Sequence, residues 1–242
     1  MCTVSFISHN DRYFITSNRD EHISRPLAHK PQEEIINDVT VLFPKDPKAG
    51  GTWFAINEYG VVSVLLNGAY VKHQSKENYA RSRGLVLLDV IGSLHPEMTL
   101  QKMNLYNIEP FTLVLLNGSL LEFRWDGNQK YFTPLDKTQD HIWSSVTLYD
   151  DAVIDKRASL FDTFLRKTTS IEAGDVVDFH SNNHEDFENG FIIDRKTGLK
   201  TFSVTQAVIE PGETLMRHID LLNDAVYEVP FSANDSLSVS IK

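Results

Sequence analysis

The sequence predicts an α+β protein built in layers, in which a few helices interrupt mostly antiparallel strands. Turn dipeptides such as Asn117-Gly118 separate short β-rich runs, which is the strongest short-range signal for β-hairpins. Apolar segments with helical spacing stand between these runs. Helices covering two packed sheets are one arrangement that buries every apolar face, and periodicity alone leaves the layering open.

Turn residues and apolar spacing define the elements of the first half of the chain. Asn10-Asp11 supplies the turn of the first hairpin, and glycines stand near both ends of the first apolar helix. The predicted elements are a hairpin of residues 2–9 and 12–19, a Pro-bounded loop at 26–47, a hairpin of 52–56 and 61–66, and helices at 82–94 and 98–105.

The second half is predicted to be mostly strands around one long helix. That helix has Val153, Phe161 and Leu165 at helical spacing, and Asp150 or Asp151 is available to cap it. The predicted elements are strands at 111–116, 120–125, 130–134 and 142–147, a helix at 150–168, a polar loop at 178–189, and strands at 191–194, 201–209 and 214–222.

Composition favours one globular domain that spans residues 1–242. Hydrophobic residues make up 41% of the chain and charged residues 23%, so the chain can bury a large core and disorder is not expected. Single β-rich domains of this length are common. There is no internal repeat and no linker long enough to separate domains.

Charge and hydropathy exclude several classes of partner. The net charge of −10 argues against nucleic acid and anionic membrane surfaces as main partners. No apolar run approaches the roughly 20 residues of a membrane-spanning helix, and the N-terminus lacks the basic region of a secretory signal. We expect a soluble, cytoplasmic protein, and a homo-oligomer is compatible with the sequence.

Metal sites are not favoured by the sequence. The single cysteine excludes an internal disulfide and a Cys-rich zinc site. His180 and His184 are four residues apart beside acidic residues, but they lie in an Asn-rich segment that favours a solvated acidic loop. We therefore predict no metal and no other cofactor.

The first hairpin brings the only thiol close to charged residues. If Asn10-Asp11 is a two-residue turn, Cys2 lies opposite Arg19, and a shift of one residue puts it opposite Asp20. A guanidinium favours the thiolate, and removal of Met1 would leave Cys2 with a free α-amine suited to take the thiol proton. The alternative is that Cys2 is an ordinary small residue at a chain end.

The second hairpin supplies residues that fit an oxyanion site. With a four-residue turn at 57–60, Gly50-Gly51 lies against Asn67 and Leu66, where glycine permits close approach and the Asn amide can donate to an oxyanion. The alternative is plain turn chemistry. Arg81 and Arg83 precede the first helix, either as ligands for a carboxylate or phosphate or as exposed helix-start charges.

Several motifs fall in order along the N-terminal third of the chain: Met1-Cys2, Asn18-Arg19-Asp20-Glu21, Ser24-Arg25-Pro26, Gly50-Gly51-Thr52-Trp53, Asn67 and Arg81-Ser82-Arg83-Gly84. Together they resemble the NRDE family, also called the transport and Golgi organisation protein 2 family. The resemblance implies an N-terminal nucleophile hydrolase with an αββα sandwich of two mostly antiparallel sheets flanked by helices. The cysteine branch of that superfamily, which includes penicillin V acylase and bile salt hydrolase, cleaves non-peptide amide bonds.

The resemblance implies roles for individual residues. Cys2, Arg19, Asp20 and Asn67 would be catalytic, and six residues would contact substrate: Asn18, Glu21, Gly51, Trp53, Arg81 and Ser145. Two departures stand out. Arg19 and Asp20 are adjacent where the branch separates the two, which leaves Asp20 or Glu21 as the acid, and Ser145 stands where related chains often carry an Asn.

The leading functional hypothesis is a cysteine amidohydrolase that cleaves a small non-peptide amide after loss of Met1, with an ester or thioester as the second choice of acyl substrate. The alternative is a non-catalytic lipid- or haem-binding trafficking protein on the same fold, because fold does not fix function. A plain structural or interaction protein is a third hypothesis.

Overall fold

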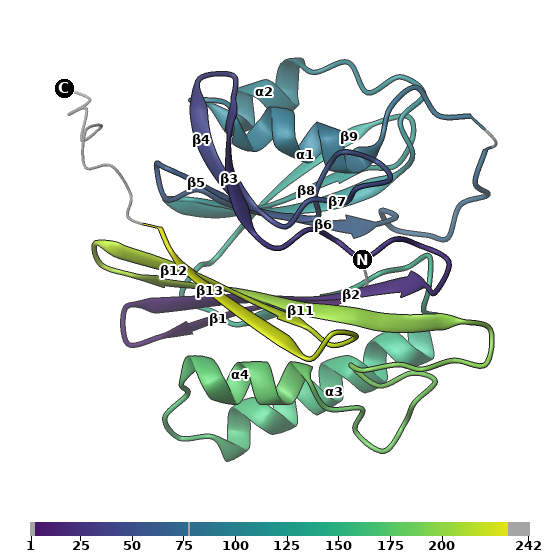
Figure 1. Ribbon diagram of the computed structural model, residues 1–242, viewed down its shortest axis with the longest axis vertical. Coiled ribbons are helices and arrows are strands. Elements are labelled where there is room, and N and C mark those ends of the chain that lie inside the picture. Colours follow the sequence, from purple (N-terminus) through teal and green to yellow (C-terminus); the bar gives the residue numbers. More distant parts are fainter. Residues whose placement is uncertain (1–2, 77, 232–242) are drawn as a thin grey trace.

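The structure is a computed structural model that describes residues 3–76 and 78–231. Its layers run helix, sheet, sheet, helix (Figure 1), which confirms the αββα sandwich. Helices α1 (Arg83–Ile91) and α2 (Pro96–Lys102) cover one sheet, and α3 (Asp151–Lys167) and α4 (Ala173–His180) cover the other. No helix of the described ranges is long and apolar enough to cross a membrane.

Both sheets are antiparallel throughout the described residues. The sheet under α3 and α4 has the order β10-β1-β2-β11-β12-β13, with bounds His141–Ser144, Thr3–His9, Arg12–His22, Leu199–Glu210, Glu213–Asp220 and Ala225–Pro230. The sheet under α1 and α2 runs from β3 to β9 in chain order, with bounds Gln32–Ile36, Val39–Phe43, Phe54–Asn57, Val62–Asn67, Phe111–Asn117, Ser119–Trp125 and Lys130–Leu135.

The register of the first hairpin is as predicted. Thr3 pairs with Asn18 and His9 with Arg12, so the turn consists of Asn10 and Asp11 alone. Both turn residues have positive φ, 51° and 59°, which is the requirement of a two-residue type I′ turn. The pair that would contain Cys2 lies outside the described residues.

The register of the second hairpin differs from the prediction by one residue. Phe54 pairs with Val64, and Asn57 donates its backbone N–H to the Val61 carbonyl, so the loop contains three residues instead of four. Gly60 closes this loop with a φ of 75°, the left-handed conformation typical of three-residue hairpin turns. The Asn57 side chain also accepts hydrogen bonds from the backbone N–H groups of Tyr59 and Val61, which fixes the shorter loop.

Two predicted helices are confirmed with their caps. The Ser82 hydroxyl accepts a hydrogen bond from the Gly84 N–H at the start of α1, and Gly92 ends that helix. Asp150 caps α3 by accepting from the Val153 N–H at 3.0 Å. These side chains satisfy donors that a helix start otherwise leaves unpaired.

The predicted loop at 26–47 is wrong, because it contains the hairpin of β3 and β4. Asn37 and Asp38 form its turn with φ of 49° and 67°, which repeats the chemistry of the first hairpin. Pro31 and Pro44 stand just outside the two strands. The prolines bound this hairpin rather than marking a structureless segment.

Three further differences lie near the C-terminus. Helix α4 was not predicted; its eight residues are stabilised by burial of Val176 and Phe179 against the sheet, a tertiary effect. Residues 191–194 form only an isolated bridge between Asp194 and Lys200 instead of a strand. Strand β13 extends the sheet beyond β12 and was also not predicted, since it is half exposed.

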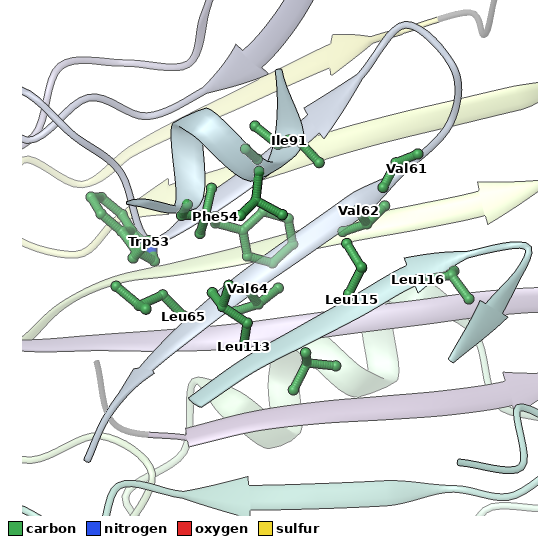
Figure 2. Packing of buried hydrophobic residues seen from close by; sticks show 14 of the residues in the cluster. Trp53, Phe54, Val61, Val62, Val64, Leu65, Ile91, Leu113, Leu115 and Leu116 are labelled. Atoms are coloured by element: carbon green, nitrogen blue, oxygen red, sulfur yellow. The ribbon is translucent and has the colours of Figure 1, made fainter. Parts of the chain in front are cut away.

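The main core lies between the two sheets and under α1. Figure 2 shows Phe54, Val64 and Leu113 packed together with Ile91 of α1. A smaller cluster fills the space between the other sheet and helices α3 and α4. Trp53 belongs to the main core and also lines the pocket described below, so core packing fixes one wall of that pocket.

A buried polar network ties α4 to the first hairpin. Asn18 donates from Nδ2 to the carbonyls of His180 and Phe191, so its Oδ1 accepts from His180 Nδ1 at 2.5 Å. His180 Nε2 then accepts from the Ser5 hydroxyl at 2.7 Å. Burial, assisted by the nearby Arg157, lowers the pKa of His180 to about 3. His180 is therefore a neutral structural residue and not part of a solvated loop.

The neutral His180 predicts acid sensitivity. Unfolded chains take up a proton at an ordinary histidine pKa near 6.5 whereas the folded protein does not, so stability falls as pH drops from about 6.5 toward 3. Between pH 6 and 4 one such proton contributes a slope of about 1.4 kcal/mol per pH unit. Urea titrations across this range should show that His180→Gln lowers this slope by about that amount.

His218 serves as the comparison. Burial also lowers its pKa, to about 4, so His218→Gln should reduce the slope above pH 4 in the same way. Tyr227→Phe, which keeps a ring against His218 and removes only a hydroxyl group, should leave the slope unchanged. An unaltered slope in His180→Gln would contradict the buried neutral histidine.

Candidate functional site

A small pocket lies between the C-terminal half of β2, the loop at 46–53, the end of β6 and the start of α1. Its volume is about 100 Å³. The lining residues are Arg19, Glu21, Arg25, Asp46, Ala49, Gly51, Thr52, Trp53, Leu65, Asn67, Ser82, Arg83 and Gly84. Five of the predicted site residues are among them: Arg19, Glu21, Gly51, Trp53 and Asn67.

Arg19 is the most deeply buried charge of the pocket, with 2% of its surface exposed. Its Nη2 donates to Asp46 Oδ2 at 3.0 Å, and its guanidinium carbon lies 4.6 Å from the centre of the Trp53 ring. Burial lowers the pKa of Arg19, while Glu21 and Asp46 oppose this shift. An arginine stays charged in proteins, so the pocket has a fixed cation at its base.

Asp46 and Arg25 complete an ion-pair network with Arg19 that the sequence pattern does not predict. Asp46 Oδ2 accepts from Arg25 at 2.8 Å as well as from Arg19, and Oδ1 accepts the backbone N–H groups of Lys48 and Ala49. Burial raises the pKa of Asp46, but the hydrogen bonds from Arg25 and Ala49 outweigh this effect and bring the pKa below its usual value. The sequence signal was the turn pattern that starts at Asp46-Pro47.

The glycines let the loop at 46–53 touch the start of α1. A Cβ on Gly51 would overlap the backbone of Gly84 and lie 2.6 Å from the Leu85 nitrogen. A Cβ on Gly84 would lie 2.7 Å from the Thr52 carbonyl oxygen. This contact brings Arg83 into the pocket wall, where burial lowers its pKa and Glu109 pairs with it at 2.9 Å.

Asp20 lies on the opposite face of β2 from Arg19, because successive side chains of a strand alternate. Its carboxylate accepts hydrogen bonds from the Tyr149 hydroxyl at 2.8 Å and the Thr201 hydroxyl at 2.6 Å. Asp20 is buried on the side of α3 and α4 and does not line the pocket. Of the two candidate acids, Glu21 is the one at the pocket.

Asn67 and Ser145 are neighbours, although only Asn67 lines the pocket. Ser145 is buried and donates from its hydroxyl to the Asn67 backbone carbonyl at 2.9 Å. It also shares a hydrogen bond with the Thr147 hydroxyl at 2.9 Å. Ser145 thus supports the end of β6 through the backbone of Asn67, and its contact with substrate stays a prediction.

Two other predicted substrate contacts are not brought to the pocket. Asn18 is fully buried in the His180 network on the helix side of β2. Arg81 pairs with Asp89 of α1 at the surface, because its side chain lies along the helix it precedes. Arg83, two residues later, lines the pocket in place of Arg81. Cys2 lies outside the described residues.

The fold defines a class of protein through its likeness to solved structures. A Caenorhabditis elegans ortholog of N-acylethanolamine-hydrolyzing acid amidase has a TM-score of 0.60 at 10% identity, with 87% of this chain and 93% of that chain covered. The C2A mutant of conjugated bile acid hydrolase from Clostridium perfringens has a TM-score of 0.56 at 12% identity, with 97% of each chain covered. The chain has the fold of the N-terminal nucleophile hydrolases.

The chain belongs to the family described as Transport and Golgi organisation 2, which it matches over residues 1–196. This confirms the resemblance carried by the N-terminal motifs. A search among curated proteins found no match.

The close contact of Gly51 with Gly84 predicts a strong effect of one methyl group. Gly51→Ala should lower the free energy of unfolding by about 2 kcal/mol or more, because the new Cβ meets backbone atoms on rigid segments. Gly174→Ala is the matched control, since a Cβ there meets nothing within 4 Å and alanine favours the helix. Thermal unfolding of both variants measures the difference. Equal melting temperatures would contradict this packing.

Proposed function

We propose that the protein is a cysteine amidohydrolase that cleaves the C–N bond of a small non-peptide amide after removal of Met1. One observation carries this proposal. Residues of four separate segments, among them Arg19 and Asn67, surround one pocket, and Arg19 directly follows the Thr3–Asn18 pair on β2. The fold of N-terminal nucleophile hydrolases and the family membership support the same assignment.

The ladder between β1 and β2 supports Cys2 as the nucleophile. Continued by one pair beyond Thr3 and Asn18, the register would oppose residue 2 to Arg19. Opposed residues of a strand pair project from the same face, and for Arg19 that is the face of the pocket. In the proposed enzyme the thiol of Cys2 opens to the pocket, and the Arg19 guanidinium favours its thiolate form.

The proposed reaction has two stages. The Cys2 thiol gives its proton to its own α-amine and forms a C–S bond with the amide carbonyl carbon. The Asn67 amide and a backbone N–H donate to the resulting oxyanion. The α-ammonium then protonates the leaving nitrogen as the C–N bond breaks. Water, deprotonated by the amine, attacks the thioester; the C–S bond breaks and releases the carboxylic acid.

The two acidic residues take different roles in this proposal. Asp20 is buried and held by the hydroxyls of Tyr149 and Thr201, which suits a fixed carboxylate that orients the α-ammonium. Glu21 lines the pocket, and its carboxylate lies 4.0 Å from Arg19 Nη2, which suits contact with substrate. Gly51 and Trp53 shape the pocket wall.

The volume of this pocket favours a small substrate over haem or lipid at this site, while two larger hollows of about 650 and 460 Å³ lie elsewhere on the molecule. Sites that enclose drug-sized ligands hold roughly 300–1,000 Å³, whereas this pocket holds about 100 Å³. Its walls are rich in charged and hydrogen-bonding groups. Such a site admits the reacting end of a substrate and a few polar atoms. A carrier would instead bind its ligand equally well without Cys2.

The proposal predicts a reactive N-terminal thiol. Because Cys2 is the only cysteine, mass spectrometry of untagged protein treated with iodoacetamide reports on one site. We expect loss of Met1, a single adduct that is absent in Cys2→Ala, and a labelling rate at pH 7 about tenfold lower in Arg19→Ala, since loss of the cation raises the thiol pKa. A screen of small amides should show turnover that Cys2→Ala abolishes.

Arg12→Ala is the control for loss of an arginine of the same strand outside the pocket. Arg12 pairs with Glu172 at an N–O distance of 2.7 Å on the surface and does not line the pocket. Arg12→Ala should label at the wild-type rate. Arg19→Lys keeps the charge and should lie between wild type and Arg19→Ala, provided that circular dichroism shows all variants folded. Amide turnover that survives in Cys2→Ala would falsify the mechanism.

A further inference from the structure

A fully buried arginine that the proposed mechanism does not use lies behind the start of β1. Arg157 of α3 has no exposed surface, and its guanidinium forms no ion pair within 4.0 Å among residues 3–76 and 78–231. A buried charge of this kind is costly unless its donors are satisfied. The groups that accept hydrogen bonds from Arg157 must therefore offset the cost of burying its charge.

The three nitrogens of the Arg157 guanidinium donate to two separate parts of the chain. Nη1 donates to the Thr3 hydroxyl, Nη2 to the Gly190 carbonyl and Nε to the Asn189 carbonyl at 3.1 Å. The planar fork of arginine can satisfy such separated acceptors at once, which lysine cannot. Arg157 therefore joins Thr3, the first residue of β1, to the loop before β11.

Arg157 also contacts the partner of Asp20. Its guanidinium carbon lies 3.6 Å from the centre of the Tyr149 ring, a cation–π geometry. The Tyr149 hydroxyl donates to Asp20, which Thr201 holds from the other side. Arg157 is thus connected to Thr3, the residue that follows Cys2, and through Tyr149 to the Asp20 carboxylate.

We propose that Arg157 is a positioning residue for the N-terminal nucleophile. It fixes Thr3, and with it the point where residue 2 joins β1, and it fixes Tyr149, which orients the Asp20 carboxylate. This inference rests on the proposed function, and Arg157 acts through these residues without touching substrate. Displacement of a reacting group by about 1 Å can cost 100-fold in rate. The contacts of Arg157 with Thr3 and Tyr149 therefore control acyl transfer to Cys2.

The test separates orientation of the thiol from its ionisation. Acylation by p-nitrophenyl acetate needs an oriented thiolate beside the oxyanion donors, whereas alkylation by iodoacetamide needs only an accessible thiolate. We expect Arg157→Met to lower the saturating acylation rate by between about 10- and 100-fold, with the half-saturating concentration and the alkylation rate changed less than about threefold. Arg157→Lys should recover part of the loss.

Thr3→Val and a stability control sharpen the result. Thr3→Val removes the acceptor of Nη1 and should lower acylation by itself, with little further loss when it is combined with Arg157→Met. Phe161→Leu weakens the packing of the same helix without touching this network, so it should reduce stability and leave acylation unchanged. Equal acylation by folded Arg157→Met and wild type would overturn the inference, as would an equal loss in Phe161→Leu.

Failure of the proposed function gives a different pattern. A wild-type Cys2 that is acylated no faster than free cysteine would reject the hydrolase. Hydrogen exchange at the Thr3 and Val4 amides then still tests whether Arg157 fixes the start of β1. These residues pair with β10 and β2, and Arg157 bonds to the Thr3 side chain. At least tenfold faster exchange at Thr3 in Arg157→Met, with Leu113 in the other sheet unchanged, would support positioning, and unchanged exchange would reject it.

Discussion

The ion pair between Arg19 and Asp46 is the interaction on which the pocket depends. Arg19 lies on β2 in one sheet, and Asp46 lies in the loop that connects β4 and β5 in the other. Removing Asp46 would take the 3.0 Å partner from a guanidinium that is 2% exposed, and breaking a buried ion pair in this way costs on the order of 3–5 kcal/mol. The pair therefore holds the two sheets in register at the open end of the sandwich, where Trp53 covers the guanidinium.

Strand alternation divides the motif Asn18-Arg19-Asp20-Glu21 between two tasks. Arg19 and Glu21 face the pocket between the layers, while Asn18 and Asp20 face α3 and α4. One half of the motif provides the charges of the site, and the other half fixes the strand to the helices. Adjacent residues of similar chemistry thus differ in function because the side-chain period of a strand is two.

Buried polar groups lie between the first hairpin and helices α3 and α4. Burying each of them costs free energy unless it forms hydrogen bonds. Asn18, His180 and Ser5 form one network, and Arg157 with Tyr149 forms a second around Asp20. Satisfied networks of this kind fix one arrangement of the surrounding elements, because any displacement leaves a polar group without its partner. They also explain why α3 and α4 keep the first hairpin in a defined position.

The sequence by itself determined the features that depend on local chemistry. The turn residues Asn10-Asp11 predicted the register that places Arg19 beyond the Thr3–Asn18 pair. Apolar patterns predicted α1, with glycines near both ends, and α3, with Asp150 as a possible cap, and the N-terminal motifs indicated the family and the fold. Asn37-Asp38 has the same turn chemistry, but the prolines on either side favoured a loop over the hairpin that forms there.

Only the tertiary structure decided which distant residues meet. Asp46 reaches Arg19 from the other sheet, and Arg157 reaches Thr3 across 154 positions of sequence. His180 of α4 is buried against the sheet that carries Ser5 and Asn18. Neither periodicity nor turn chemistry contains these contacts, because they arise when the layers pack and each buried polar group must find a partner. The assignment of Asn18 to the scaffold rather than the pocket has the same origin.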